Sequence, residues 1–339
     1  MHPEQANGAV QLSVCIIGRN EGRHLAACAA SLRQLAALGI RYETVFVDSA
    51  STDDSVAIAR AHFGKVICLS ASQFLNAGAA RHVGTNHCTG TWILYMDGDM
   101  ELCPESLPVI DELIRSGRQH AGACAYTENV FPDGTRNLIE FKGNLPGKPC
   151  RMIGGTSILP RSDVIAVGNW ACSLFAYEES ELYSRLLAHG VEVIWHPCRL
   201  VEHKTPKVPT LRKLVGVVIP YRSYLGKKFY GAGQVTQLTI RSGNFSNFAR
   251  LKPDAYLMSA SLIAAVLASP MMGWYALALP AAALAINCVR SGIRGAVNNA
   301  CWQSQLIFGL GRLESGFTPV IEQVWTGAHS RVNAVKSLP

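Results

Sequence analysis

The sequence predicts an α/β domain built on a parallel sheet, followed by a C-terminal, membrane-associated helical hairpin. Two observations predict this architecture. Apolar runs typical of strands alternate with helical stretches near the N-terminus, and this alternation is typical of a parallel α/β sheet. Residues 255–289 contain no Asp, Glu, Lys, Arg or His, although the chain before them has the composition of an ordinary globular protein. Such an uncharged segment is typical of helices in a membrane.

The predicted sheet begins with β-branched runs at 12–17, 42–47 and 65–69. Continuous apolar strands of this kind are buried on both faces, and a parallel sheet binds its ligands at the carboxyl ends of its strands. Helices are predicted at 21–38, 55–62, 77–86 and 178–189, with shorter strands and turns over 121–160.

A further apolar strand, at 92–96, ends in two carboxylates, Asp97 and Asp99, which are separated by Gly98. A buried strand does not hold unpaired charges, so both carboxylates are expected at the lip of a cleft. Two hard oxygen donors there suit Mg²⁺ or Mn²⁺ bound to phosphate oxygens. The alternative is an ordinary Asp-Gly turn that closes the strand.

Asp48 ends the second predicted strand, and Asp53 and Asp54 follow it at the start of the next helix. A carboxylate at the carboxyl end of a parallel strand can accept hydrogen bonds from the base or ribose of a nucleoside. The alternative is a helix-capping acid, but Asp53 and Asp54 already fill that role. We therefore expect Asp48 to contact a ligand.

The uncharged segment 255–289 is interrupted at 269–273 by Ser-Pro-Met-Met-Gly. A spanning helix needs roughly 20 residues, so each half is short unless the break contributes to it. A tight helical hairpin that spans or re-enters the membrane fits best, and a buried pair of soluble helices is the alternative. Because cations flank the segment on both sides, both ends are expected in the cytoplasm. These cations are Arg250, Lys252, Arg290 and Arg294.

The net charge of +7 is concentrated in Lys and Arg residues between positions 199 and 252. No basic-aromatic motif of a nucleic-acid-binding module accompanies them, so anionic membrane lipid or a phosphate-bearing substrate is the expected partner, and nucleic acid is not. The eleven cysteines include no Cys-x-x-Cys pair, which suits a reducing compartment. The polar N-terminus carries no secretory signal, so the bulk of the chain is expected in the cytoplasm, at the inner membrane.

Several short motifs, in order along the chain, resemble family 2 glycosyltransferases. The opening strand ends in Asn20-Glu21, and residues 47–53 resemble the Val-Asp-Asp-Gly-Ser-Thr-Asp signature of that family. Asp97-Gly98-Asp99 falls where the family has its Asp-x-Asp motif. The other motifs are the Ala-Arg-Asn-x-Gly-like helix at 76–84, the Gly-Gly turn at 154–156 and the Glu-Asp-x-Glu-Leu-x-x-Arg-like helix at 178–185. The resemblance covers roughly residues 12–205.

The resemblance implies a Rossmann-like GT-A domain that binds a nucleotide sugar and transfers the sugar with inversion. In that interpretation residues 1–205 form the catalytic domain and 206–250 a basic juxtamembrane or acceptor segment. Residues 251–339 form the hydrophobic helical hairpin and a tail. A Mg²⁺ or Mn²⁺ ion would neutralise the charge that develops on the nucleoside-diphosphate leaving group.

The resemblance also implies a role for each matching residue. Arg19 and Glu21 would line the nucleoside pocket, Asp48 would hold the base, Arg81 would approach the base or diphosphate, and Asp97 would contact ribose or a metal-bound water. Asp99 would ligate the metal, with His203 as a further metal or diphosphate ligand. Glu179 stands where the family usually has Asp and would be the base that deprotonates the acceptor hydroxyl. Glu178 is the alternative if the helix register differs by one.

The predicted acceptor is lipid-linked, for example carried on a polyprenyl phosphate, or a polysaccharide precursor at the cytoplasmic face of the membrane. Two other functions stay open. A nucleotidyltransferase would use similar strand-end acids with a metal, and Gly18-Arg19 is a faint version of its glycine-rich loop. A catalytically degenerate transferase could act as a membrane assembly subunit, for which glutamate at position 179 is the main support.

Overall fold

The computed structural model describes residues 9–71, 75–139, 141, 143–206, 230–310, 319–326 and 330–332. The chain divides into two compact units. The first comprises Met1–Ser173, Arg185–Lys207 and Ser315–Pro339, and the second comprises Leu174–Ser184 and Val208–Glu314. The part of the predicted basic segment 206–250 that precedes position 230 lies largely outside the described residues. The boundaries of this segment, like those of the other predicted domains, stay predictions.

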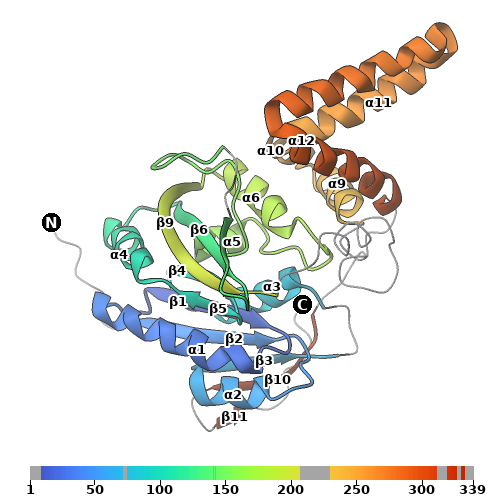
Figure 1. Ribbon diagram of the computed structural model, residues 1–339. Helices are drawn as coiled ribbons and strands as arrows, with labels where there is room; N and C mark the ends of the chain where they lie inside the picture. Colours follow the sequence, from blue (N-terminus) through green and yellow to red (C-terminus); the bar gives the residue numbers. More distant parts are fainter. Residues whose placement is uncertain are drawn as a thin grey trace. The chain divides into compact units, whose positions relative to one another are not determined.

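The first unit is built on one mixed sheet of strands in the order β11-β10-β3-β2-β1-β4-β8-β6-β9-β5, with β7 beside β6 (Figure 1). The strands are β1 (Leu12–Gly18), β2 (Tyr42–Asp48), β3 (Lys65–Leu69), β4 (Trp92–Asp97), β5 (Met100–Leu102), β6 (Ala121–Val130), β7 (Arg136–Ile139), β8 (Ile158–Pro160), β9 (Glu192–Lys204), β10 (Ile321–Thr326) and β11 (Ser330–Val332). Neighbouring strands β3, β2, β1 and β4 are parallel, as the sequence predicts.

The helices of the first unit alternate with these strands, and the predicted helices are confirmed within a few residues. They are α1 (Gly22–Leu32) with its 3₁₀ extension Arg33–Leu38, α2 (Ser55–His62), α3 (Ala77–His87), the 3₁₀ turn Pro104–Ser106, α4 (Leu107–Ser116) and α5 (Arg161–Ala166). Helix α6 (Glu178–Ala188) begins in the second unit and ends in the first.

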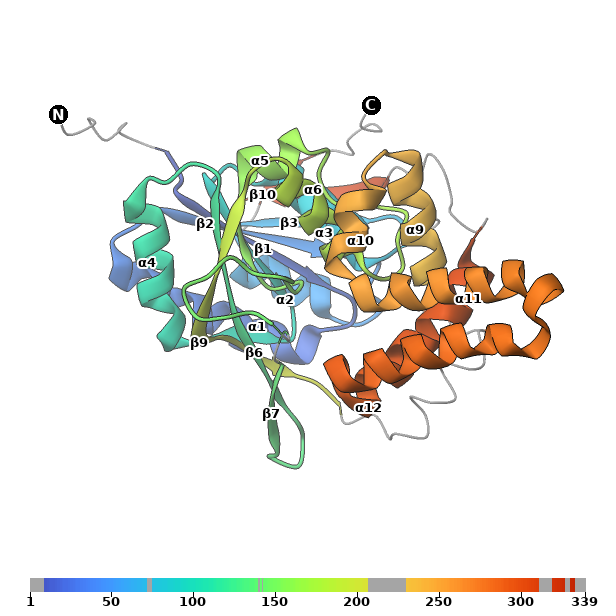
Figure 2. The ribbon, with the colours of Figure 1, turned by 90° about the horizontal axis from the view of Figure 1, so that it is seen from above.

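Side chains of β1 alternate between the two faces of the sheet, as the period of a strand requires. Val14 and Ile16 enter the core cluster that contains Leu25 of α1. The opposite face packs against α3 so closely that a Cβ added to Gly84 would lie 2.2 Å from the Sγ atom of Cys15. Helices thus cover both faces of the parallel strands (Figures 1 and 2), and the strands are apolar on both sides.

The register of the parallel strands places two predicted site residues at the same edge of the sheet. β1 lies between β2 and β4, with Gly18 opposite Asp48 and Ile17 opposite Asp97. All three strands therefore end together, and the two carboxylates flank the end of the central strand. This is the carboxyl edge at which such sheets bind ligands.

A strand after the hairpin completes the sheet, in the segment that the sequence analysis treats only as a tail. β10 pairs antiparallel with β3, with Val324 opposite Ile67. The edge of the parallel sheet is thereby covered by chain that lies more than 200 positions later in the sequence. Periodicity within so short a run does not reveal a partner this distant.

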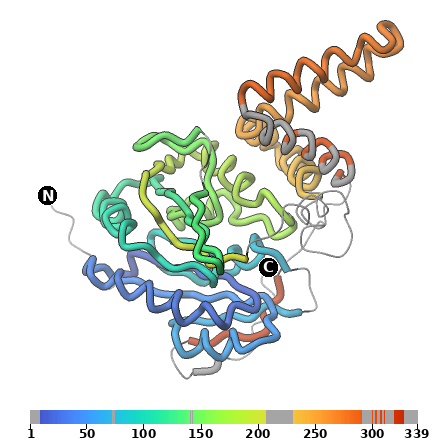
Figure 3. The backbone as a smooth tube through the Cα atoms, viewed as in Figure 1, coloured from blue at the N-terminus to red at the C-terminus, as the bar shows by residue number. Residues whose placement is uncertain are grey.

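The second unit is helical and contains the predicted hairpin. Its helices are α9 (Gly231–Arg241), α10 (Phe245–Leu251), α11 (Pro253–Met272), the 3₁₀ turn Gly273–Leu277 and α12 (Ala278–Gly309). α11 and α12 run side by side in opposite directions (Figures 2 and 3). The reversal occurs at Gly273, whose φ of 57° is a conformation that glycine adopts without strain. α12 continues well beyond the uncharged segment, to Gly309.

The surface of the hairpin is strongly apolar. Met271 is 92% exposed and Trp274 72% exposed, and Val266, Leu267 and Val289 are exposed as well. The segment Pro253–Arg290 is long and apolar enough to cross a membrane, and only 11% of its most apolar window is buried. A buried pair of soluble helices would hide these side chains. The hairpin is therefore a candidate membrane-associated element.

Candidate functional site

The carboxyl edge of the first unit brings Asp99 and His203 together. Asp99 follows the end of β4 and leads directly into β5, which pairs antiparallel with β9 so that Met100 lies opposite His203. The Nε2 atom of His203 is 3.1 Å from Oδ2 of Asp99. The two residues are separated by more than 100 positions, and this strand pairing alone makes them neighbours.

Asn129 on β6 fixes the orientation of the His203 ring. It lies opposite His203 in the parallel pair of β6 and β9, and its Oδ1 atom is 2.9 Å from Nδ1 of the imidazole. An imidazole that donates its Nδ1–H to a carboxamide oxygen presents the Nε2 lone pair to a metal. Sequence reasoning missed Asn129, because only the pairing of β6 with β9 makes it relevant.

Glu21 joins Asp97 and Asp99 in a cluster of carboxylates. Burial raises the pKa of Glu21 to about 7, and the nearby charges of Asp99 and Asp97 add to that rise. Burial also raises the pKa of Asp97, with Asp99 contributing and Arg81 opposing. A site in which the charge of Asp99 raises the pKa of both Glu21 and Asp97 is one that a cation stabilises. The structure places Glu21 near the two aspartates, and its predicted place in the nucleoside pocket stays a prediction.

One oxygen of Asp99 has no protein partner in the described part of the chain. Oδ1 of Asp99 is buried and accepts no hydrogen bond there, while Oδ2 faces His203. A buried carboxylate oxygen without a donor is costly, so this atom can accept a hydrogen bond from a ligand or bind a cation. The carboxylates here are hard oxygen donors that suit Mn²⁺ or Mg²⁺, so the residues present fit a divalent cation, with the imidazole as an additional ligand.

The guanidinium of Arg81 in α3 lies close to three residues, Asp97, Trp170 and Gly155. Its Nη2 atom lies 3.1 Å from Oδ1 of Asp97, and the residue is only 3% exposed. The guanidinium lies 5.0 Å from the centre of the Trp170 ring. Gly155 also lies against the guanidinium, since a Cβ added there would lie 2.4 Å from Nη2. The Gly-Gly turn predicted from the sequence thus makes room for Arg81, and Arg81 positions Asp97.

The loops after β1 and β2 are tied to each other beside Asp48. Asp48 is buried, and its two oxygens accept hydrogen bonds from the amide and the hydroxyl of Ser51. Burial raises the pKa of Asp48, and the bonds from Ser51 oppose that rise. Asn20 and Ala50 both have positive φ, at 60° and 57°. Such strain in side-chain-bearing residues persists where surrounding contacts enforce it, and it gathers at binding sites. Arg19 is exposed on this rim.

Glu179 belongs to the second unit, at the start of α6. Its neighbours Glu178 and Glu181 are buried, whereas Glu179 is partly exposed. Tyr177 precedes these acids with a φ of 68°, and its ring packs against Trp302 at 4.8 Å. Within the same unit Lys252 lies over the Tyr177 ring; burial lowers the pKa of Lys252, and the charge of Glu179 opposes this. Of the two candidate bases, Glu179 is therefore the more exposed.

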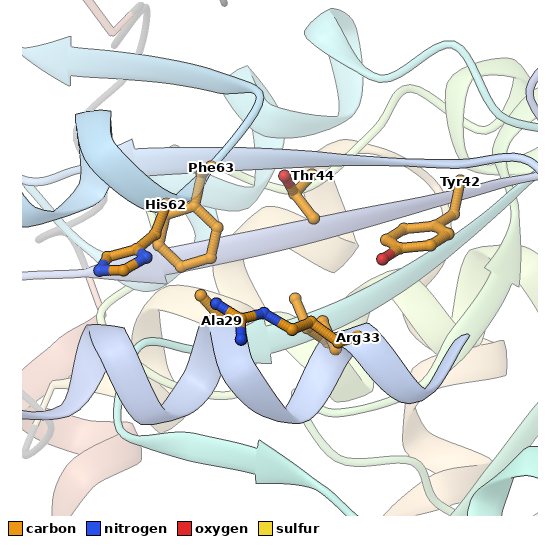
Figure 4. A pocket seen from close by; sticks show the side chains of 7 residues that line it. Ala29, Arg33, Tyr42, Thr44, His62 and Phe63 are labelled. Atoms are coloured by element: carbon orange, nitrogen blue, oxygen red, sulfur yellow. The ribbon is translucent and has the colours of Figure 1, made fainter. Parts of the chain in front are cut away.

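A cavity of about 140 Å³ lies elsewhere in the first unit, between α1, α2 and the start of β2 (Figure 4). Its walls include Arg33, Tyr42, Thr44 and Phe63. Because Tyr42 and Thr44 begin β2 and Asp48 ends it, the cavity is not at the carboxyl edge. It gathers no carboxylates, so it is not the site of the predicted chemistry.

Comparison with known proteins identifies the family. Residues 13–170 match the family model "Glycosyl transferase family 2". They form a glycosyl transferase family 2 domain. The matched stretch contains Asp48, Arg81, Asp97 and Asp99, so the resemblance predicted from the sequence motifs is confirmed.

Curated relatives of this glycosyltransferase domain carry similar names. An undecaprenyl-phosphate 4-deoxy-4-formamido-L-arabinose transferase of Klebsiella pneumoniae is 24% identical over 160 residues, which is 45% of this chain and 44% of the relative. An uncharacterized glycosyltransferase of Rickettsia felis is 32% identical over 109 residues, which is 32% of this chain and 36% of the relative. The chain therefore spans less than half of the length of these relatives.

Solved structures confirm the GT-A fold. The mannosyltransferase PcManGT of Pyrobaculum calidifontis, solved with GDP-Man and Mn²⁺, has a TM-score of 0.53 at 14% identity and covers 91% of this chain and 89% of its own. S. aureus TarS (residues 1–349) has a TM-score of 0.51 at 16% identity and covers 84% of this chain and 92% of its own. At these identities the likeness shows the fold alone.

Replacing Gly155 by alanine is expected to lower kcat/KM for sugar transfer about 100-fold. The added Cβ forces the guanidinium of Arg81 away from its place, and Asp97 then loses the partner that positions it. A displacement of about 1 Å in a catalytic group costs roughly that factor. Gly64→Ala is the matched control, because its Cβ would meet nothing closer than 3.5 Å. Equal activity of the two variants in steady-state assays would refute the positioning role of Arg81.

Replacing Asn129 by alanine is expected to weaken divalent-metal binding by about 10- to 100-fold, the usual effect of removing a group that orients a ligating histidine. The measurement is the Mn²⁺ concentration that gives half-maximal activity, supported by calorimetric titration of Mn²⁺. Asn137→Ala on β7, whose side chain is exposed, is the control. If the metal requirement of both variants matches that of the unmodified chain, His203 does not depend on Asn129.

Proposed function

We propose that this chain is an inverting, divalent-metal-dependent glycosyltransferase that acts at the cytoplasmic face of the inner membrane. It takes a sugar from a nucleotide-sugar donor and transfers it to a lipid-linked or polysaccharide-precursor acceptor. The observation that carries the proposal is the buried Oδ1 atom of Asp99, which has no hydrogen-bond partner among the described residues and lies in a carboxylate cluster beside His203.

In this proposal Asp99 and His203 hold a Mg²⁺ or Mn²⁺ ion, and Asp97 and Glu21 add negative charge around it. The ion, when bound, neutralises charge on the diphosphate leaving group. Asn129 keeps the imidazole of His203 in its ligating orientation, and Arg81 keeps Asp97 on the donor side of the cleft. Asp48 and the exposed Arg19 border the nucleoside end of the same edge.

Glu179 acts as the base in the proposed reaction. Its carboxylate accepts the proton of the acceptor hydroxyl as that oxygen forms a bond to the anomeric carbon and the bond to the diphosphate oxygen breaks. Attack from the face opposite the leaving group inverts the anomeric carbon. Glu178 remains the alternative base.

A lipid-linked acceptor is supported by the exposed apolar hairpin and by the name of the Klebsiella pneumoniae relative, which refers to undecaprenyl phosphate. The cations at the two bases of the hairpin support the cytoplasmic orientation. Arg290 forms an ion pair with Asp254 at 3.1 Å, which ties the two arms together at the end away from the turn.

The acceptor is tested with the full-length chain in proteoliposomes that contain a sugar carried on undecaprenyl phosphate, so that the acceptor group is a hydroxyl. Each of a panel of radiolabelled nucleotide sugars is added with Mn²⁺, and label in the organic phase is measured. We expect label in that phase with at least one donor and a return to background with EDTA. If nucleoside diphosphate is released but label stays aqueous, the lipid acceptor is wrong and polysaccharide precursors are the next acceptors to supply.

A further inference from the structure

A second cluster of potential metal ligands lies at the opposite edge of the sheet of the first unit. His120 immediately precedes β6, Asp163 lies in α5 directly after β8, and His189 follows α6 and precedes β9. β8 is antiparallel to both β4 and β6, so its last residues lie beside the first residues of those strands. The cluster is thus separated from Asp97 by the length of β4, about 17 Å for a strand of this size.

Both histidines approach the same carboxylate oxygen. Nδ1 of His120 is 2.8 Å and Nε2 of His189 is 3.5 Å from Oδ1 of Asp163. One ligand atom from each residue can be chosen so that all three lie within 4.8 Å of one another. The His120 and His189 side chains are 52% and 41% exposed, whereas Asp163 is buried. A fixed carboxylate with two adjustable rings can close around an ion by small side-chain rotations.

We propose that His120, Asp163 and His189 bind one Zn²⁺ ion. Two imidazole nitrogens and one carboxylate oxygen, with water in the fourth position, form a set of ligands that Zn²⁺ commonly takes in proteins. Mg²⁺ and Mn²⁺ prefer sites richer in oxygen, so this site differs in chemistry from the donor site. His120, whose ring lies at Asp163, has a φ of 55°, a conformation that is uncommon outside glycine.

Such an ion would fasten together three segments that are far apart in the sequence. It would link the start of β6, the start of α5 and the turn after α6, where the amide of Glu192 already bonds to the carbonyl of His120 at 2.8 Å. Because the cluster is remote from Asp97, the Zn²⁺ ion would stabilise the first unit without taking part in sugar transfer. The inference therefore does not rest on the proposed function.

The test uses Co²⁺ as a spectroscopic substitute for Zn²⁺ in the full-length Asp99→Ala variant, in which the donor site is disabled. After EDTA treatment and its removal, we expect one equivalent of Co²⁺ to bind with visible absorption typical of low coordination number, and one equivalent of Zn²⁺ to displace it. Adding His120→Ala or His189→Ala should weaken binding at least 100-fold. Adding His62→Ala, another exposed histidine, should leave binding unchanged.

Thermal unfolding in EDTA checks that the variants fold. All of them should have similar unfolding midpoints, because the rings of His120 and His189 are exposed. Added Zn²⁺ should raise the midpoint only when both histidines are present. The proposal is overturned if the Asp99→Ala variant binds no Co²⁺, or if the His120→Ala and His189→Ala variants bind it as tightly as the His62→Ala control.

Discussion

Replacing Asp99 by alanine is expected to lower kcat/KM for sugar transfer by about 1000-fold or more. The variant removes the carboxylate that faces His203 and leaves the cation with a single direct ligand from this pair. Metal stabilisation of a leaving group contributes several kcal/mol to a barrier, and each 1.36 kcal/mol corresponds to a factor of ten in rate. Release of nucleoside diphosphate at saturating donor and Mn²⁺ measures the effect.

Glu101→Ala is the matched control for Asp99→Ala. Glu101 lies on the same strand pair and forms an ion pair with Lys204 at 3.4 Å, on the partly exposed side of the sheet. Exposed pairs of this kind contribute little to stability, so this variant should stay within about twofold of the unmodified chain. An Asp99→Ala variant that is equally active would remove Asp99 from the metal site and with it the basis of the proposed mechanism.

Replacing Glu179 by glutamine is expected to lower kcat by about 100- to 10,000-fold, the contribution typical of a general base. Glutamine keeps the shape of the side chain but cannot take the proton of the acceptor hydroxyl. Because Glu179 belongs to the second unit and the donor ligands to the first, KM for the donor should stay nearly constant. Single-turnover rates with saturating donor and acceptor separate the two parameters.

Glu178→Gln discriminates between the two candidate bases. Glu178 is buried at the first position of α6, whereas Glu179 is partly exposed. We therefore expect Glu178→Gln to retain most of the activity and Glu179→Gln to lose it. The reverse order would assign the base to Glu178, and full activity of both variants would exclude a carboxylate base from the start of this helix.

Much of the fold follows from local patterns in the sequence. Continuously apolar runs predict strands that are buried on both faces of a sheet. These runs become β1, β2, β3 and β4. Parallel pairing then requires Asp48 and Asp97 to share an edge, and the register confirms it. The uncharged segment predicts a hairpin, although α12 continues beyond it to Gly309 through a more polar stretch.

The rest depends on contacts between distant positions. Asn129 matters only because β6 pairs with β9, and Gly155 matters only because α3 delivers Arg81 beside it. The raised pKa of Glu21 arises from burial and from Asp99, neither of which is visible in the sequence around Glu21. Likewise, His120 and His189 meet at Asp163 because β8 lies between β4 and β6 in the sheet. No short motif in the sequence encodes this arrangement.

The most direct test of the central claim is release of free nucleoside diphosphate from a panel of UDP-, GDP- and dTDP-sugars by the full-length chain. The assay is run with acceptor lipid and with Mn²⁺, Mg²⁺ or EDTA. The account predicts release from at least one donor that requires one of the two metals and is lost in Asp99→Ala. Release that persists in EDTA, pyrophosphate release from nucleoside triphosphates instead, or donor binding without any turnover would contradict a metal-dependent glycosyltransferase.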